Sequence, residues 1–214
     1  MNNRLSPLQE DLLHAFFRRE ESFFLSGGAA LVGFHLAHRE THDLDLFTLE
    51  DTMDRGWLAL VGAARDLGAT IEAIQTAPEF RRVLVQRGDE AVVVDLIREY
   101  VVQVSPEKQI IGNIRVDPPE EIMANKLCAL LSRSEIRDLV DVRALELAGY
   151  KLEDALTAAE AKDRGLTPAQ LAWVLSQIEF GSDMIPPGDV SAQELRDYLA
   201  ELIIRLTKIA YPAS

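Results

Sequence analysis

Two aspartates that lie one residue apart, Asp43 and Asp45, interrupt the apolar stretch DLDLF. Successive side chains of a strand point to opposite faces, so a strand here puts both carboxylates on one face and both leucines on the other. Like charges repel each other, and Mg²⁺ takes carboxylate oxygens as ligands. The spacing therefore predicts a metal-binding pair. The alternative is a strand end at which both acids reach water.

A third aspartate, Asp95, interrupts the β-branched run in AVVVDLI. This run is typical of a central strand that is covered on both faces. A charge buried there without a partner would cost several kcal/mol. We therefore expect one of two partners for Asp95. It joins Asp43 and Asp45 in a cup for one or two metal ions, or it forms a structural ion pair with an arginine.

Lys126 is the third unusual residue, because it falls on the apolar side of an expected helix. At 100° per residue it lies within the arc defined by Ile122, Met123, Leu127 and Leu130. A buried-edge ammonium is suited to hold a phosphate, whereas the alternative is a side chain that snorkels along the apolar stripe. Asp138 and Asp141 lie one turn apart on the next helix. They would orient Lys126, join the metal site or belong to a structural network.

The elements that carry these residues divide the chain into two parts. An α/β core is expected over 1–115 and a helical lobe over 116–214, with a capping box at Asp117, Pro118 and Glu120 near the start of the second. The expected helices of the core are 6–20, 29–38 and 54–68, and its expected strands are 22–28, 43–47, 70–75, 79–87 and 90–97. The expected helices of the second lobe are 118–133, 135–148, 151–163, 167–178 and 191–209.

Composition limits the classes of function. The 214 residues are 48% hydrophobic, enough for a proper core, and contain neither an apolar run of membrane-spanning length nor a signal-peptide pattern. The single cysteine, Cys128, excludes an internal disulfide and a cysteine-rich zinc site. Location in the cytoplasm is the expectation from these features.

The net charge of −13 argues against general binding to polyanions. A nucleic-acid substrate would have to be held locally by a small group of arginines. Two such groups are Arg81, Arg82 and Arg87, and Arg133, Arg137 and Arg143. The alternative for both groups is a solvated surface with scattered ion pairs.

Two blocks of the sequence resemble the AbiEii/AbiGii toxin family of nucleotidyltransferases. LSGGAALVGFHLAHRETHDLDLF is similar to the family's L-x-G-G-T-A-L followed by H-R-x-S-x-D-x-D-L-F, with Arg39 and Thr41 at the family's Arg and Ser positions. PEEIMANKLCALLSR, followed by RDLVDV, is similar to the family's E-E-x-x-x-x-K-L-x-A-L-x-x-R and R-D-x-x-D-L. The two blocks occur in the family's order and span residues 23 to about 145.

This resemblance implies an α+β fold: a polymerase-β-like nucleotidyltransferase core, with a small mixed sheet and flanking helices, followed by a C-terminal helical bundle. It implies that nucleotide phosphates meet the helix N-terminus after the glycine turn, which agrees with the physics of such sites. The implied nucleotide-binding residues are Ser26, Gly27, Gly28, Arg39 and Lys126. The implied ligands of two Mg²⁺ ions are Asp43, Asp45 and Asp95. By the same resemblance Asp95 activates the attacking hydroxyl, Lys126 contacts the triphosphate, and Asp138 or Asp141 is the late acid.

Two positions depart from the family pattern. Ala29 stands where most relatives have Thr or Ser, and Ile122 stands where they have glutamine. A hydroxyl contact to phosphate is therefore missing, and Ser26 is the residue near the turn that could replace it. Both changes leave room for weak or altered activity.

The leading hypothesis is an Mg²⁺-dependent nucleotidyltransferase that moves an NMP group from an NTP to RNA, such as a tRNA end, or to a protein hydroxyl. By the resemblance it would be the toxin of a toxin–antitoxin or abortive-infection pair whose antitoxin is often a DNA-binding repressor. The alternatives are a catalytically inactive nucleotidyltransferase fold that binds a partner, and a metal-dependent phosphodiesterase. A zinc site at His35, His38 and His42 is a weaker interpretation, because no cysteine completes it.

Overall fold

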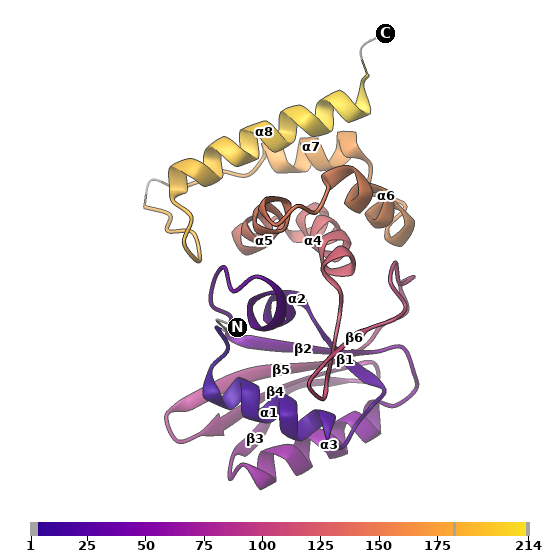
Figure 1. The fold of residues 1–214 in the computed structure, drawn as a ribbon, viewed down its shortest axis with the longest axis vertical. Coiled ribbons are helices and arrows are strands. Elements are labelled where there is room, and N and C mark those ends of the chain that lie inside the picture. Colours follow the sequence, from indigo (N-terminus) through magenta and orange to yellow (C-terminus); the bar gives the residue numbers. More distant parts are fainter. Residues whose placement is uncertain (1–3, 182, 213–214) are drawn as a thin grey trace. The chain divides into compact units, whose positions relative to one another are not determined.

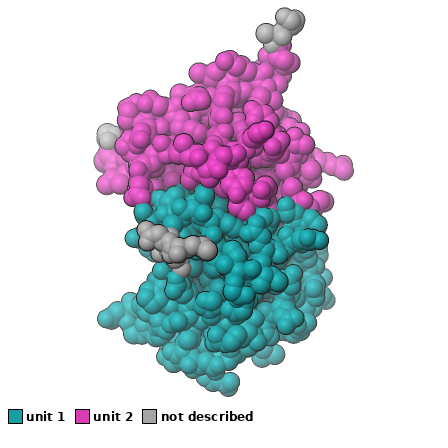
Figure 2. Space-filling model, in the orientation of Figure 1, with its two compact units in different colours: residues 1–101, 105–118 teal, residues 102–104, 119–214 magenta. Residues whose placement is uncertain are grey.

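The computed structural model describes residues 4–181 and 183–212 and has the expected α+β fold. It divides into two compact units, which are described separately below (Figure 2). Unit 1 comprises residues 1–101 and 105–118, and unit 2 comprises residues 102–104 and 119–214. The expected boundary at 115/116 falls within the last strand, where Val116 pairs with Leu25 of unit 1.

A mixed sheet of seven strands forms the centre of unit 1, in the order β3-β4-β5-β2-β1-β7-β6 (Figure 1). The pairs β2–β5 and β1–β7 are parallel, and the other neighbours are antiparallel. The strands are β1 (Phe23–Ser26), β2 (Asp43–Thr48), β3 (Thr70–Ala77), β4 (Phe80–Arg87), β5 (Glu90–Arg98), β6 (Gln109–Ile111) and β7 (Ile114–Val116).

One face of this sheet is apolar and is covered by helices. Along β2 the buried residues alternate with half-buried ones, and Leu44 and Leu46 are buried as the sequence predicts. Helices α1 (Pro7–Phe17) and α3 (Met53–Asp66) pack together on this side, and the short helix α2 (Gly27–Ala30) lies on the other (Figure 1). The carboxylates of β2 therefore belong to the face opposite the α1–α3 core.

The local sequence explains how several of these elements begin and end. Ser6 caps α1 in a capping box with Gln9, and Pro7 occupies the first turn, as expected. Gly68, with φ of +64°, follows the end of α3. Helix α2 continues directly into a π-helical turn, η1 (Leu31–His35), which helical spacing alone did not distinguish from an ordinary helix.

Residues 109–119 differ from the sequence-based prediction in two respects. Strands β6 and β7 form a short antiparallel hairpin around Gly112, and β7 extends the sheet beside β1. In addition, α4 begins at Pro119 rather than at residue 118. The carboxylate of Asp117 lies 2.6 Å from the buried ammonium of Lys108.

Unit 2 is helical, as expected. Its helices are α4 (Pro119–Arg133), α5 (Ile136–Leu147), α6 (Leu152–Lys162), α7 (Pro168–Ser176) and α8 (Ala192–Ala210). Helix α4 packs against α5, α6 and α7, and α8 packs mainly against α7. Across residues 4–181 and 183–212, no helix has both the length and the apolar character needed to cross a membrane.

Candidate functional site

Strand register places three of the predicted site residues on one face of the sheet in unit 1. Ser26 of β1 pairs with Asp45 of β2, Asp45 pairs with Asp95 of β5, and Asp95 pairs with Arg82 of β4. Residues that are paired across neighbouring strands point to the same face. We call these four residues the acid row. Asp43 lies two residues before Asp45 and shares its face, as the sequence predicts.

Arg82 holds the carboxylate of Asp95 with two hydrogen bonds. Its Nε donates to Oδ1 over 2.8 Å and its Nη2 donates to Oδ2 over 2.6 Å. This is the bidentate geometry that an arginine fork makes with a carboxylate. The hydrogen bonds to Asp95 raise the pKa of Arg82, and the charges of Asp95, Asp45 and Asp43 raise it further. The structural ion pair that the sequence left open for Asp95 is thus present.

The two glycines before α2 allow close approach of the backbone to polar side chains. Gly27 has φ of +66°, and a Cβ there would lie 2.5 Å from Oδ2 of Asp45. A Cβ on Gly28 would lie 2.7 Å from Nη2 of Arg39. Gly27 is therefore favoured by both its conformation and its close contact, whereas a side chain at Gly28 would displace the end of the Arg39 side chain.

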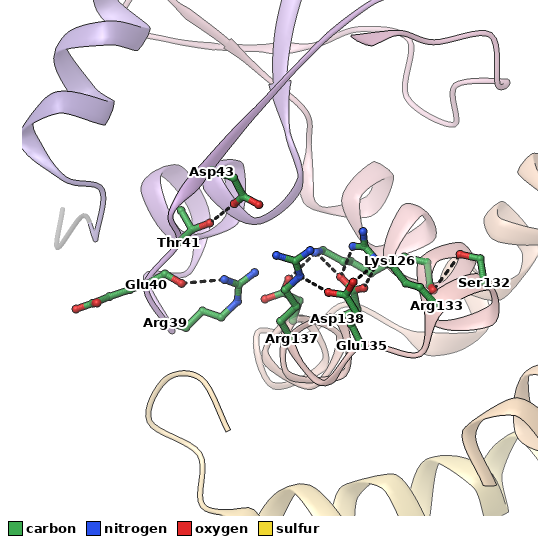
Figure 3. A network of polar contacts seen from close by, with 12 residues as sticks. Arg39, Glu40, Thr41, Asp43, Lys126, Ser132, Arg133, Glu135, Arg137 and Asp138 are labelled. Carbon is green, nitrogen blue, oxygen red and sulfur yellow. Dashed lines mark hydrogen bonds and ion pairs between the residues drawn. The ribbon is translucent and has the colours of Figure 1, made fainter. Parts of the chain in front are cut away.

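Thr41 and Arg39 support this turn and the carboxylate pair. The Thr41 hydroxyl donates to Oδ1 of Asp43 over 2.7 Å, and Nη1 of Arg39 donates to the carbonyl of Glu40 over 2.8 Å (Figure 3). Both side chains are buried. Thr41 thus fixes one carboxylate, and Arg39 fills the space that Gly28 leaves.

The start of α2 has no side-chain cap. Ser26 is the N-cap residue, is buried and makes no capping hydrogen bond. Ala29, which replaces the expected Thr or Ser, is buried as well. The first backbone N–H groups of a helix lack intrahelical partners, so this turn is suited to an anion.

Asp43 and Asp45 fit a magnesium ion better than the three-acid cup does. Within the described residues there is no group of three or more His, Cys, Asp or Glu side chains that could hold a metal. Both oxygens of Asp95 accept hydrogen bonds from Arg82. Mg²⁺ is commonly bound by one or two carboxylates together with substrate phosphates. The two-carboxylate arrangement meets that requirement, and Asp95 as a third ligand stays a prediction.

The other three predicted site residues form a buried cluster inside unit 2. The Lys126 ammonium lies 2.7 Å from Asp138 Oδ1 and 2.7 Å from Asp141 Oδ2. All three side chains point inward, so Lys126 does not snorkel to solvent. These contacts are those expected of aspartates that orient Lys126 and of a structural network, and the role of the two aspartates stays a prediction.

Charge pairing in this cluster outweighs the cost of burial. Burial alone would lower the pKa of Lys126, but Asp141 and Asp138 raise it overall. Burial would raise the pKa of Asp138, yet Lys126 and Arg133 lower it overall. Arg133 donates from Nε to Asp138 Oδ2 over 2.8 Å (Figure 3). Lys126 and Asp138 are therefore both held in their charged forms.

Two further buried lysine–carboxylate pairs escaped the sequence-based prediction. Lys108 pairs with Asp117 in unit 1, and Lys162 pairs with Glu121 in unit 2. Lys162 also donates to the carbonyl of Val102, which attaches residues 102–104 to unit 2. Lysine is rare in this chain, with five among 22 basic residues, and that rarity was the available signal.

The remaining predicted residues have structural contacts. Nε2 of His35 lies 2.9 Å from the carbonyl oxygen of Asp117, and the zinc interpretation finds no ligand cluster among the described residues. Arg81 pairs with Asp54, and Arg87 pairs with Asp11 and Glu90. Those two arginines therefore take part in ion pairs, as the alternative for that group stated.

Solved structures resemble this chain in fold over nearly its whole length. JHP933 from Helicobacter pylori is 21% identical, with a TM-score of 0.52, and the match covers 97% of both chains. MenT4, a nucleotidyltransferase toxin from Mycobacterium tuberculosis, is 14% identical, with a TM-score of 0.62, and the match covers 94% of this chain and 82% of MenT4. The comparison with curated proteins finds no match.

The sequence itself also matches a family model. The match to the nucleotidyl transferase AbiEii toxin family of type IV toxin–antitoxin systems covers residues 11–208. This range contains the glycine turn, the acid row and the lysine–aspartate cluster of unit 2, so the resemblance seen in two sequence blocks extends to almost the entire chain. The chain belongs to the AbiEii family of nucleotidyl transferase toxins.

Proposed function

We propose that this protein transfers an NMP group from an NTP to a hydroxyl group, with Mg²⁺ and with release of pyrophosphate. The observation that carries the proposal is the close approach of Gly27 to Asp45, where a Cβ would lie 2.5 Å from the carboxylate oxygen. This contact brings a potential phosphate-binding turn directly beside a potential magnesium ligand. Family membership supports nucleotidyl transfer as the type of reaction.

We assign each of the site residues of unit 1 a separate role in this reaction. The N–H groups at the start of α2 would receive nucleotide phosphates, with Ser26 as the nearby hydroxyl. Asp43 and Asp45 would hold Mg²⁺, which would stabilise the negative charge of the leaving pyrophosphate. Thr41 keeps the Asp43 carboxylate in position through its hydrogen bond. Arg39, packed against Gly28, would complete the phosphate site from behind the turn.

Asp95 is the proposed base that takes the proton of the attacking hydroxyl. A carboxylate can accept a proton, and the two hydrogen bonds from Arg82 hold the Asp95 carboxylate in a fixed position. Asp95 is also the register neighbour of Asp45, so the base lies next to the metal ligand on the adjacent strand.

Lys126 is proposed to contribute positive charge toward the triphosphate. Asp138 and Asp141 hold its ammonium and would fix its direction. One ammonium has three N–H donors, and these two acids account for two of them.

The proposed setting is the toxin half of a toxin–antitoxin pair that acts in the cytoplasm. The type IV toxin–antitoxin assignment of the family supports a cognate antitoxin. A repressor protein is the proposed antitoxin, and abortive infection is the proposed role. RNA, including a tRNA end, and a protein hydroxyl are the two acceptor classes considered.

The test is label transfer from each α-³²P-labelled NTP to total cellular RNA and to total protein, with and without Mg²⁺. The wild type is compared with Asp43→Asn/Asp45→Asn, which keeps the side-chain shapes and removes two charges. We expect label on a macromolecule only when the wild-type protein and Mg²⁺ are both present. Absence of transfer with every NTP from folded protein would contradict the proposal.

A catalytically inactive binding protein is the second candidate. It is favoured by Ala29, which removes a hydroxyl from the helix start, and by the Arg82 fork that occupies both oxygens of Asp95. This candidate predicts that Mg²⁺–NTP binds without transfer, as equilibrium dialysis with labelled NTP would show. Breakdown of RNA without NTP would instead indicate a phosphodiesterase.

A further inference from the structure

The acid row has two different ends. Ser26, beside the glycine turn, lies at the β1 end, and Arg82 lies at the β4 end, beyond Asp95. In the proposed reaction the nucleotide phosphates belong at the first end. The attacking hydroxyl belongs next to Asp95, so its carrier must approach from the side of Arg82.

Arg82 is only partly used by Asp95. An arginine has five N–H donors, and the pair with Asp95 takes two of them. In the described part of the chain the other three donate to no further residue. The side chain is 45% exposed although its partner Asp95 is only 7% exposed. Arg82 thus presents cationic donors to solvent from a fixed position.

An apolar row runs beside the acid row on the same face. Phe47 of β2 pairs with Ile97 of β5, and Ile97 pairs with Phe80 of β4. The guanidinium of Arg82 lies 5.6 Å from the centre of the Phe80 ring. Each of these three residues is half-buried. A cation that holds phosphate and a neighbouring aromatic surface on which bases stack are the two components of single-strand binding sites.

The other arginines of β4 differ from Arg82 in face and in partner. Arg81 and Arg87 lie on the opposite face, because they are an odd number of residues from Arg82. Arg81 pairs with Asp54 and Arg87 with Asp11 and Glu90. Arg82 is therefore the arginine of this strand whose partner is the proposed catalytic base.

We propose that Arg82 binds a backbone phosphate of a single-stranded nucleic-acid acceptor while it positions Asp95, with Phe80 stacking against a base. The attacking hydroxyl would then be the strand's terminal hydroxyl. In this step Asp95 takes the hydroxyl proton, the oxygen forms a bond to the α-phosphorus of the NTP, and the bond to pyrophosphate breaks. This inference rests on the proposed function and narrows its acceptor to nucleic acid.

Because the net charge of the chain is −13, the position of a cation such as Arg82 decides where nucleic acid can bind. An acidic protein repels nucleic acid in general, so binding requires a local cationic contact. A flat guanidinium matches two oxygens of a phosphate, and a protein hydroxyl brings no such group. The chemistry beside Asp95 therefore favours a strand end over a serine, threonine or tyrosine side chain.

The test measures binding and transfer with the full-length protein. A fluorescein-labelled single-stranded RNA is titrated with wild type, Arg82→Gln and Arg81→Gln at several salt concentrations, and anisotropy is read. Arg81→Gln is the matched control, because it changes the net charge by the same amount but lies on the opposite face of the sheet. We expect Arg82→Gln, and not Arg81→Gln, to bind the RNA about tenfold more weakly. This loss corresponds to the free energy of one charge-assisted hydrogen bond. The salt slope of Arg82→Gln should be smaller by about 0.7, the value for one phosphate contact on a single strand.

Arg82→Lys keeps the charge but loses the fork, so it should retain the wild-type salt slope with intermediate affinity. In transfer assays, Arg82→Lys should raise KM for RNA and leave KM for the NTP unchanged. Circular dichroism of each variant verifies that it is folded.

The outcomes separate this inference from the proposed function. RNA affinity and salt slope that are equal in Arg82→Gln and wild type would overturn the phosphate contact, even if RNA labelling falls. Labelling of protein and not RNA by wild type would overturn the choice of acceptor and leave nucleotidyl transfer intact. If wild type transfers no label but Arg82→Gln still weakens RNA binding selectively, the proposed function fails and the phosphate contact stands.

Discussion

The carboxylates of unit 1 and those of unit 2 differ in how far basic side chains balance their charge. Asp43, Asp45 and Asp95 share a sheet face with Arg82, so the formal charges of these four residues sum to −2. Asp138 and Asp141 lie with Lys126 and Arg133, and those charges sum to zero. The sheet face has an excess of negative charge that a divalent cation would balance, whereas the helical cluster is balanced by its own side chains.

Solvent access differs in the same direction. Asp43 and Asp45 are half-buried, whereas Asp138 and Asp141 are completely buried. Removing a partner from a buried ion pair is costly, because the remaining charge cannot be hydrated. Near solvent the same loss costs much less. The comparison indicates that the helical cluster holds its charges in a fixed arrangement, whereas Asp43 and Asp45 keep theirs accessible to a ligand.

The largest expected effect follows from breaking the balanced cluster. Lys126→Met should lower the free energy of unfolding by about 3–5 kcal/mol at pH 7, because it leaves two buried carboxylates without their ammonium. Lys208→Met, at an exposed position of α8, is the matched control and should change it by less than about 0.5 kcal/mol. Urea denaturation of both variants measures the difference. Equal stability of the two variants would mean that the Lys126 pairs contribute nothing.

The pH dependence of this cluster has a definite sign. In wild type the pKa of Asp138 is below its ordinary value of 3.8, so its stabilisation is present above that pH and is lost as pH falls further. The pKa of Lys126 lies above 10.5, so its contribution is complete below that pH and is lost as pH rises through the folded-state pKa. Wild-type stability from this cluster should therefore be flat between pH 5 and pH 7.

The Lys126→Met variant should show the opposite trend on acidification. Without the ammonium, burial is the largest influence on Asp138 and raises the pKa of its carboxyl, with Arg133 as the remaining opposing partner. Folding then takes up protons, so the variant should gain stability relative to wild type as the pH is lowered from 7 to 5. Urea midpoints at both pH values test this. A deficit that stays constant or grows on acidification would contradict the assignment.

A smaller effect is expected at the glycine turn. Gly27→Ala and Gly68→Ala each force a side chain into the left-handed region, at about 1–2 kcal/mol. Gly68 has open space around it, whereas the new Cβ at Gly27 would lie 2.5 Å from the Asp45 carboxylate. Thermal unfolding should therefore show the larger loss for Gly27→Ala. Nucleotide binding should be impaired in that variant alone, and equal nucleotide binding by both would argue against a phosphate site at this turn.

Much of the carboxylate face could be predicted from local pattern. The alternation in DLDLF is sufficient to put Asp43 and Asp45 on one face, and the apolar run around Asp95 is sufficient to indicate an interior strand. The pairing of Asp95 with Arg82 could also have been predicted from the sequence. A two-residue turn at Gly88 and Asp89 sets the β4–β5 register, which places Arg82 opposite Asp95.

Other parts of the site depend on contacts that local pattern does not contain. Asp45 and Asp95 are neighbours because β2 and β5 pair in parallel across 50 residues, and no turn fixes that register. The inward direction of Lys126 follows from helical periodicity, but the full burial of Lys108 and Lys162 depends on how distant segments pack. Strands β6 and β7 have three residues each, too few to show an alternation.

The smallest expected effect concerns the hydrogen bond that orients Asp43. Thr41→Val keeps the shape of the side chain and removes the hydroxyl that donates to Oδ1 over 2.7 Å. Because Asp43 is half-buried and water can replace the donor, stability should fall by only about 1 kcal/mol. The carboxylate would lose its fixed direction, so Mn²⁺, as a probe for Mg²⁺, should bind several-fold more weakly in calorimetric titration. Thr41→Ser retains the donor and should restore most of the affinity, which distinguishes loss of the hydrogen bond from loss of packing. Equal Mn²⁺ affinity in wild type and Thr41→Val would show that the two carboxylates of β2 need no outside support, and the contrast with the internally fixed acids of unit 2 would then be sharper still.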